Sequence, residues 1–278
     1  MRDCLPPNNK KMSSSIITLI IGGLIFGSLL NVIIYRLPLI TEKNKFNLFY
    51  PRSHCRECKQ TIQYLHNIPI LSYLFLRGKC AYCKKPITIQ YPLIEIITSL
   101  LTVQAGLYFG LNIELFFSLF FLYMLIVISV IDINYKIIPD SLSLALLWTG
   151  ILVSLLFSPS TFSVFPIDPV SSILGAILGY LILWCIFHIY LLVSHKEGLG
   201  YGDFKLLAAL GAWLGWKLIP FILFFSSILG ITFGFWLILN KKIKKDTPIP
   251  FAPFLAISGW ISMIFDVKII KIYSFLQL

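Results

Sequence analysis

The sequence predicts an all-α polytopic membrane protein with about eight transmembrane helices and one small domain outside the bilayer. Three observations lead to this fold class. Of the 278 residues, 58% are hydrophobic and only 13% are charged, and the mean hydropathy is +0.86. Soluble domains are about half apolar and a quarter charged, so this chain could not bury its apolar side chains in one aqueous fold. Several apolar runs also reach the length of about 20 residues that a helix needs to cross a bilayer.

The candidate spans are apolar runs that polar or glycine-rich segments separate. They cover residues 16–35, 92–110, 113–131, 141–158, 170–193, 204–216, 218–239 and 251–267. The run at 204–216 is short and contains Gly211 and Gly215, so residues 204–239 form either two spans or one span and a re-entrant segment. The first run follows a basic stretch without a small-residue cleavage site, and we expect it to be retained as a span instead of being removed as a signal peptide.

Positive charge is concentrated beside the spans, and this predicts the orientation in the membrane. Residues 36–91 contain ten Lys or Arg and two Glu, and four more lysines lie between positions 241 and 245. If both segments face the cytoplasm, cytoplasmic segments hold seventeen basic residues and outer segments hold six, which agrees with the positive-inside rule and leaves both termini outside. The net charge of +11 does not predict nucleic-acid binding, because a nucleic-acid platform also needs aromatic residues interleaved on a soluble domain.

The spans and the basic segment divide the chain into three parts. Residues 1–35 are the N-terminal tail and first span, residues 36–91 are the only sizeable domain outside the bilayer, and residues 92–278 contain the remaining spans. The middle domain has 56 residues, which is too few for an apolar core to stabilise comfortably by itself. We therefore expect this domain to contain a cross-link.

Four cysteines in this domain can supply the cross-link. Cys55 and Cys58 form one CxxC pair and Cys80 and Cys83 form a second, with 21 residues between the pairs. Two such pairs suit tetrahedral Zn²⁺, and in the reducing cytoplasm a metal is favoured over disulfides. Because cysteine fills all four ligand positions, none is open for substrate, and the zinc is predicted to be structural.

Two aspartates lie at the ends of different spans. Asp132 follows the apolar run at 113–131, and Asp203 lies in the glycine-rich segment GLGYGDFK just before the run at 204–216. Charged side chains near the hydrocarbon are costly and are usually functional. We expect the glycines to let other parts of the chain approach closely and to free Asp203 from helical geometry.

Two close carboxylates at one membrane face are what an aspartic protease needs. One ionised aspartate takes a proton from water while the other, protonated, polarises the scissile carbonyl, and the pair shares one proton. The alternative is that Asp132 and Asp203 lie in solvated loops and cap the following helices. That alternative is preferred for Asp140, because the preceding proline indicates a helix start. Glu95 and Glu114 are expected to be ordinary acidic residues in the first turns of helices.

The segments around both aspartates carry a family resemblance. Residues 129–140, SVIDINYKIIPD, and residues 196–207, KEGLGYGDFKLL, resemble the two aspartate signatures of bacterial type IV prepilin peptidases, which are grouped with the GxGD membrane proteases. Further segments that resemble this family lie at 27–38, 68–73, 77–80, 91–95 and 248–253. The similarity therefore extends from about residue 22 to residue 260, which is nearly the whole chain.

The resemblance implies a peptidase and a methyltransferase in one protein of the bacterial inner membrane. The peptidase would remove the basic leader of type 4 prepilins and type II secretion pseudopilins after a Gly, at the cytoplasmic membrane face, with Asp132 and Asp203 as its catalytic pair and no metal. The second activity would N-methylate the new N-terminal residue, usually Phe, with S-adenosylmethionine, and it is associated with the four-cysteine domain. No Gly-rich strand–turn–helix loop is present, so the residues that bind S-adenosylmethionine are not predicted.

Two other functions are compatible with these features. A peptidase that has lost methylation would keep the four-cysteine domain for substrate docking. A proton-coupled transporter would also contain paired acidic residues, but such carriers place them near the midplane on discontinuous helices, whereas Asp132 and Asp203 lie at span ends. The resemblance therefore favours the bifunctional enzyme, with prepilin-type proteins and the lipid bilayer as its partners.

Overall fold

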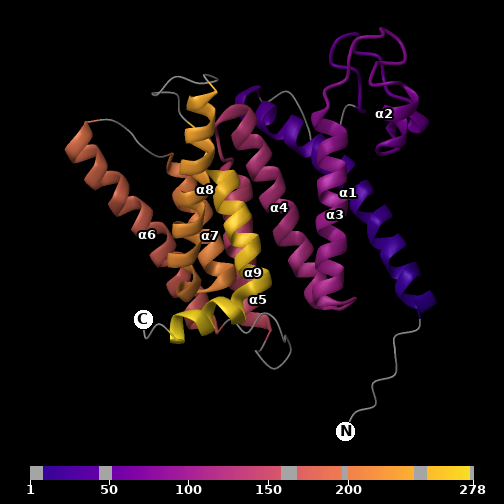
Figure 1. Cartoon of the computed structure of the whole chain (residues 1–278). Helices are drawn as coiled ribbons and strands as arrows, with labels where there is room; N and C mark the ends of the chain where they lie inside the picture. Colours follow the sequence, from indigo (N-terminus) through magenta and orange to yellow (C-terminus); the bar gives the residue numbers. More distant parts are fainter. Residues whose placement is uncertain (1–8, 44–51, 158–167, 196–199, 241–248, 276–278) are drawn as a thin grey trace. The chain divides into compact units, whose positions relative to one another are not determined.

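The computed structural model describes residues 9–43, 52–157, 168–195, 200–240 and 249–275 (Figure 1). Within these ranges the chain forms helices, turns and two isolated β-bridges but no β-strand, so the all-α prediction is confirmed. The chain divides into two compact units, Met1–Tyr123 and Met124–Leu278, and the boundary falls within helix α4 (Ile113–Tyr135). The three-part division at residues 35 and 91 stays a prediction.

Unit 1 contains two long helices, a small domain that connects them, and the start of α4. Its elements before α4 are α1 (Asn9–Lys43), η1 (Tyr64–Asn67), α2 (Leu71–Phe75) and α3 (Gln90–Phe109). Helices α1 and α3 run side by side, and the small domain lies at one end of this pair (Figure 1). The four cysteines belong to this small domain, between the first two spans.

Two glycines of α1 allow α1 and α3 to cross closely. A Cβ atom on Gly23 would lie 2.5 Å from the Cα of Ser99, and one on Gly27 would lie 2.8 Å from the Cα of Glu95. The Gly-x-x-x-Gly spacing of Gly23 and Gly27 is common where membrane helices touch through their backbones. As a consequence, the backbone of α1 lies directly against Glu95.

Unit 2 places one short helix among longer ones. Its complete elements are α5 (Asp140–Leu156), α6 (Pro169–Ser194), α7 (Tyr201–Leu214), η2 (Trp216–Leu218), α8 (Ile219–Leu239) and α9 (Ala252–Phe275). Helix α7 is the central one, because it contacts α5, α6, α8 and α9 and every residue from Asp203 to Leu214 except Lys205 is buried. The first turn of this buried helix carries Asp203.

Small residues give α7 its central position. A Cβ atom on Gly211 of α7 would lie 2.1 Å from the carbonyl oxygen of Gly175 of α6. One turn away, a Cβ on Gly179 would lie 2.6 Å from the carbonyl oxygen of Leu207. The backbones of α6 and α7 are therefore in direct contact, as small residues at this spacing permit between membrane helices.

Hydrogen bonds from buried side chains attach α7 to both neighbours. The Ser172 hydroxyl of α6 donates to the carbonyl oxygen of Ala212 over 2.7 Å. The indole Nε1 of Trp213 donates to the carbonyl oxygen of Leu146 in α5, also over 2.7 Å. Gly150 makes room for this indole, since a Cβ there would lie 2.6 Å from Cδ1 of Trp213. These contacts fix the position of α7 against α5 and α6.

Five helical segments in the described part of the chain are long and apolar enough to cross a membrane. They are Ser14–Ile40, Gln90–Phe109, Ile113–Tyr135, Pro169–Ser194 and Trp216–Leu239. In an apolar stretch of 18 residues within each segment, only 17% to 44% of the residues are buried inside the protein. Most of these residues are therefore available to lipid, as expected of a multi-pass membrane protein.

The eight predicted runs all coincide with helices, although the number of membrane crossings stays a prediction. Helices α5 and α7 have 17 and 14 residues, fewer than the roughly 20 that span a bilayer without distortion. Residues 204–239 contain most of α7, then η2 and α8, because the chain turns at Gly215, whose φ of 77° suits glycine. Whether they form two spans or one span and a re-entrant segment stays a prediction.

Candidate active site and metal centre

Asp132 lies in the last turn of α4 and is only 7% exposed. A carboxylate at a helix C-terminus is unfavourable, because the end of the helix carries partial negative charge. Helix α9 compensates for this. Its first residue, Ala252, donates its backbone N–H to Oδ2 of Asp132 over 3.1 Å. The Asp132 carboxylate therefore occupies the N-terminus of α9, where the first N–H groups of a helix have no partner within it.

Asp203 is the third residue of α7 and is also 7% exposed. Its Oδ2 accepts the N–H of Gly200, the residue before the helix, over 3.3 Å. The expectation that glycines free Asp203 from helical geometry is wrong, because the helix begins at Tyr201 and Asp203 reaches back to cap it. The expected close approach is confirmed at Gly202, where a Cβ would lie 2.7 Å from the Cβ of Ile138.

Asp132 and Asp203 come together in unit 2 although they belong to different helices. Their carboxylates are close enough to interact electrostatically. One oxygen of each accepts a backbone N–H at a helix N-terminus, and among the described residues the other oxygen has no hydrogen-bond donor, so it is available to water or substrate. Two buried carboxylates held in this way can carry out general acid–base chemistry on one water molecule.

Asp140 differs from these two aspartates in exposure and in partner. It is the first residue of α5, so its interpretation as a residue of a helix start is confirmed. Its side chain is 62% exposed, and its Oδ1 accepts a hydrogen bond of 2.6 Å from Nζ of Lys205. An exposed ion pair of this kind contributes little to stability.

The four cysteine sulfurs of the small domain lie within 4.8 Å of one another. The Sγ atoms of Cys55 and Cys83 are 3.9 Å apart, and the four described cysteines here are free thiols. Sulfurs at about 2.3 Å from a tetrahedral zinc ion would be roughly 3.8 Å from one another. The structure therefore brings the predicted ligands Cys55, Cys58, Cys80 and Cys83 together in a cluster that fits a metal ion.

The two CxxC turns have the same backbone geometry. In each turn the N–H of the first cysteine donates to the carbonyl oxygen five residues later, over 2.9 Å. The residues that follow the second cysteines, Lys59 and Lys84, have positive φ angles of 56° and 59° and donate back to the first cysteines. An ion pair between Glu57 and Lys85 joins the two turns, and the Lys85 ammonium lowers the pKa of Glu57.

The cysteine thiols do not ionise equally. The N–H groups of Cys83 and Tyr82 donate to the Cys80 sulfur and lower the pKa of Cys80 to about 7. The N–H of Lys85 lowers the pKa of Cys83, but burial and the neighbouring cysteine side chains together raise it to about 11. The cluster therefore favours one thiolate, and further thiolates form only when a cation compensates their negative charge. A metal ion that binds to such a cluster supplies this charge and releases the thiol protons.

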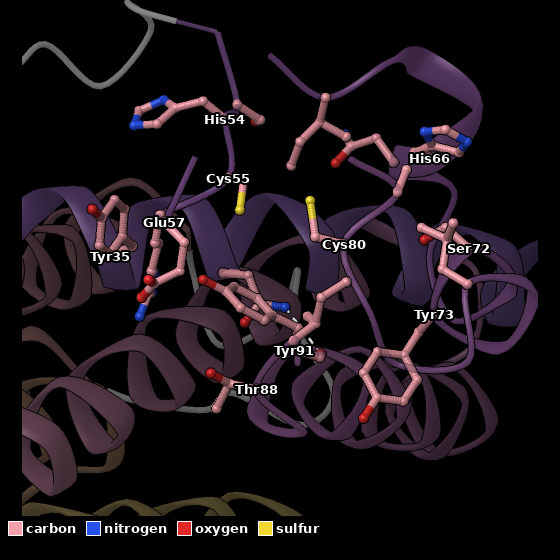
Figure 2. Close-up of a pocket in the computed structure, with 18 of the residues that line it drawn as sticks. Tyr35, His54, Cys55, Glu57, His66, Ser72, Tyr73, Cys80, Thr88 and Tyr91 are labelled. Atoms are coloured by element: carbon pink, nitrogen blue, oxygen red, sulfur yellow. Dashed lines mark hydrogen bonds between the residues drawn. The ribbon is translucent and has the colours of Figure 1, made fainter. Parts of the chain in front are cut away.

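Unit 1 also contains a cavity of about 400 Å³ between α1, the start of α3 and the four-cysteine domain (Figure 2). Glu95 lines it, and the expectation that Glu95 is an ordinary first-turn acid is wrong. It lies in the second turn of α3, is 8% exposed, and accepts the backbone N–H of Ile70 over 2.8 Å. Its position inside an apolar run was the signal in the sequence, because a charge there is costly. For Glu114 the first-turn interpretation is confirmed.

Comparisons with known proteins cover nearly the whole chain. The model of the bacterial peptidase A24 N-terminal domain matches residues 21–109, and that of the type IV leader peptidase family matches residues 119–235. Three similar proteins bear the name prepilin leader peptidase/N-methyltransferase. The one from Legionella pneumophila is 42% identical over 276 residues, 92% of this chain and 93% of the relative. The one from Aeromonas hydrophila is 39% identical over 90% of this chain and 91% of the relative. The one from Pseudomonas aeruginosa is 38% identical over 91% of this chain and 91% of the relative. No solved structure matches the chain.

Proposed function

Because this chain belongs to the type IV leader peptidase family, we propose that it cleaves the basic leader peptide from type 4 prepilins and type II secretion pseudopilins after a Gly residue. We further propose that it N-methylates the new N-terminal residue, usually Phe, with S-adenosylmethionine. The names of its relatives include both activities. The alternative is a peptidase without methylation that keeps the four-cysteine domain for substrate docking, and the names of the relatives favour the bifunctional enzyme over it.

The pairing of Asp132 and Asp203 carries the peptidase assignment. Both side chains are buried, both accept a backbone N–H, and their carboxylates interact. The charge-assisted hydrogen bonds from Ala252 and Gly200 fix the orientation of each carboxylate, so that little reorganisation is needed during the reaction. We therefore assign the catalytic roles to these two residues and not to the exposed Asp140.

Peptide cleavage requires one proton shared by the pair, because two close carboxylates do not both ionise cheaply. The ionised aspartate accepts a proton from a water molecule as the water oxygen attacks the carbonyl carbon of the Gly. The protonated aspartate donates a hydrogen bond to the carbonyl oxygen. When the C–N bond breaks, a proton passes to the amine of the next residue, which becomes the new N-terminus.

We assign Cys55, Cys58, Cys80 and Cys83 to a structural Zn²⁺ ion. Four thiolates leave no open position on the metal, so the ion would cross-link the two CxxC turns and would not touch substrate. Methylation is assigned to unit 1, which holds this cluster. S-adenosylmethionine supplies a methyl group on a positively charged sulfonium centre, and the protein must place the new amine next to it.

The proposed location is the bacterial inner membrane, with the four-cysteine domain and the aspartates at the cytoplasmic side. The seventeen basic residues in the segments assigned to that side support this orientation. The lysines at 241–245 are among them, and they lie outside the described residues. The substrates would be prepilins and pseudopilins, which enter from the bilayer.

The experiment uses membranes that contain the wild type, Asp132→Asn or Asp203→Asn, a prepilin with a basic leader followed by Gly and Phe, and S-adenosylmethionine. Mass spectrometry reads both the loss of the leader and the added methyl group. We expect the wild type to cleave and methylate, and each variant to leave the precursor intact. Asp168→Asn is the matched control, because Asp168 caps α6 through the N–H of Ser171 and asparagine caps helices equally well.

The outcomes separate the two assignments. Cleavage by the Asn variants at the wild-type rate would show that the catalytic residues are misassigned. Cleavage without methylation by the wild type would retain the peptidase and exclude the transferase. Loss of cleavage in Asp168→Asn as well would mean that the assay reports folding and not catalysis.

A further inference from the structure

We propose that the cavity of unit 1 is the site of methyl transfer, and that Glu95 binds the cationic reactants there and takes up the proton that the amine loses. This inference rests on the methyltransferase activity proposed above. The cavity has a volume of about 400 Å³, within the roughly 300–1,000 Å³ of small-molecule sites. It is formed by elements of unit 1 alone, so it is complete within that unit.

Glu95 brings a buried negative charge to the wall of this cavity. Its carboxylate accepts the N–H of Ile70, and the side chain of Ser28 also interacts with it. These two partners are neutral, so neither balances the negative charge. Arg36, Arg56 and Lys85 also line the cavity, but none of them forms an ion pair with Glu95 in the described part of the chain. A buried carboxylate without an ion-pair partner is costly, and a positively charged ligand beside it would reduce that cost. Both the sulfonium of S-adenosylmethionine and the ammonium form of a peptide N-terminus have this charge.

The backbone that holds Glu95 is strained. Ile70 has a φ of 59° and a ψ of −51°, and a positive φ is a genuine outlier for a β-branched residue. Such strain persists only where the surrounding structure enforces it, and it concentrates at functional sites. Here the strained residue is the one that donates its N–H to the Glu95 carboxylate. The strain therefore serves to orient the buried carboxylate of Glu95.

Other lining residues match the remaining parts of S-adenosylmethionine. The guanidinium of Arg56 lies over the ring of Tyr35 at 4.1 Å and over that of Tyr91 at 5.4 Å, which fixes a positive charge at the wall. This charge suits the carboxylate of the methionine portion. Nδ1 of His66 is buried and has no hydrogen-bond partner among the described residues, so it can bind a polar group of the nucleoside. Tyr35, His66 and Tyr91 are all drawn around the cavity in Figure 2.

The chemical step balances with these groups. The lone pair of the neutral N-terminal amine forms a bond to the methyl carbon, and the carbon–sulfur bond breaks with its electrons remaining on sulfur. The amine nitrogen is then positively charged, and one of its protons passes to the Glu95 carboxylate. A carboxylate that holds the cation and then takes the proton serves both stages.

The test compares the full-length wild type with Glu95→Gln, which keeps the shape and the acceptor for Ile70 but removes the charge. We expect the affinity for S-adenosylmethionine, measured by titration calorimetry, to fall about tenfold or more. The affinity for S-adenosylhomocysteine, a neutral thioether, should change much less. Methylation of a pre-cleaved pilin peptide should fall, whereas leader cleavage should continue at the wild-type rate. Glu114→Gln is the matched control, because Glu114 is similarly buried at 5% exposure and does not line the cavity.

A second measurement on the unmodified protein covers the case in which Glu95→Gln does not fold. Ultraviolet cross-linking of radiolabelled S-adenosylmethionine, followed by peptide mapping, should label segments that contain Tyr35, Arg56 or Tyr91. Label confined to unit 2 would overturn the proposal, as would equal methylation and binding by Glu95→Gln and the wild type. If the wild type neither binds S-adenosylmethionine nor methylates, the methyltransferase function itself fails, which is a different result.

Discussion

The contact between α6 and α7 predicts that Gly211→Ala impairs peptide cleavage although it lies two turns away from Asp203. The added Cβ would lie 2.1 Å from the carbonyl oxygen of Gly175 and 2.5 Å from its carbon. Both are backbone atoms, so no side chain can rotate away to make room. Relief requires that the two helices move apart, and α7 carries Asp203 in its first turn.

The size of the effect follows from this geometry. Ordinary van der Waals contact begins at about 3.4 Å, so the helices would have to separate by about 1.3 Å at Gly211. A misplacement of about 1 Å in a catalytic group can cost about a hundredfold in rate, and overpacking costs about 1–3 kcal/mol in stability. We expect cleavage to fall between tenfold and about a hundredfold and the Tm to decrease.

The assay measures initial rates of leader cleavage and the Tm of the purified protein in detergent. Gly230→Ala is the control, because a Cβ at Gly230 would have its nearest neighbour at 3.5 Å and alanine favours the helix. Methylation of a pre-cleaved peptide should persist in Gly211→Ala, which separates local displacement from unfolding. A wild-type cleavage rate with an unchanged Tm would refute the reasoning, because it would show that the α6–α7 contact does not position Asp203.

Three further predictions concern the metal cluster, the exposed aspartate and a strained turn. In Cys58→Ser, the metal content measured by elemental mass spectrometry should fall from about one ion per chain to near zero, and methylation should be lost while cleavage continues. A variant that retained the metal would contradict a four-thiolate site. Asp140→Asn removes an exposed ion pair worth at most about 1 kcal/mol, so cleavage should stay within about threefold of the wild type, and a loss as complete as that of Asp132→Asn would place Asp140 in the active site. Gly78 has a φ of 68°, and a Cβ there would lie only 3.0 Å from the Tyr73 hydroxyl oxygen. Gly78→Ala should therefore lower the free energy of unfolding by about 1–2 kcal/mol and lower the Tm, and an unchanged Tm would show that the turn can relax.

Much of the architecture could be predicted from local sequence. Apolar runs of bilayer length become helices because a backbone in hydrocarbon must satisfy its own hydrogen bonds. The eight predicted runs therefore coincide with helices in the structure. The spacing of the two CxxC pairs was sufficient to predict the four-cysteine cluster. Each pair needs only its own tight turn, and the four sulfurs come together where the two turns meet.

Local sequence was thus enough to predict which segments are helices, which cysteines cluster and which aspartates are candidates. The surroundings of each acidic residue depend instead on how the helices pack. Asp132 is held by the N–H of Ala252, which is 120 residues away in the chain, and Asp203 proved to lie inside a helix. Glu95 became a candidate for methyl transfer because Gly27 brings α1 against it and Ile70 donates to it. The physical reason is that helix formation and tight turns depend on neighbours in sequence, whereas the burial and partners of a charge depend on how distant helices pack.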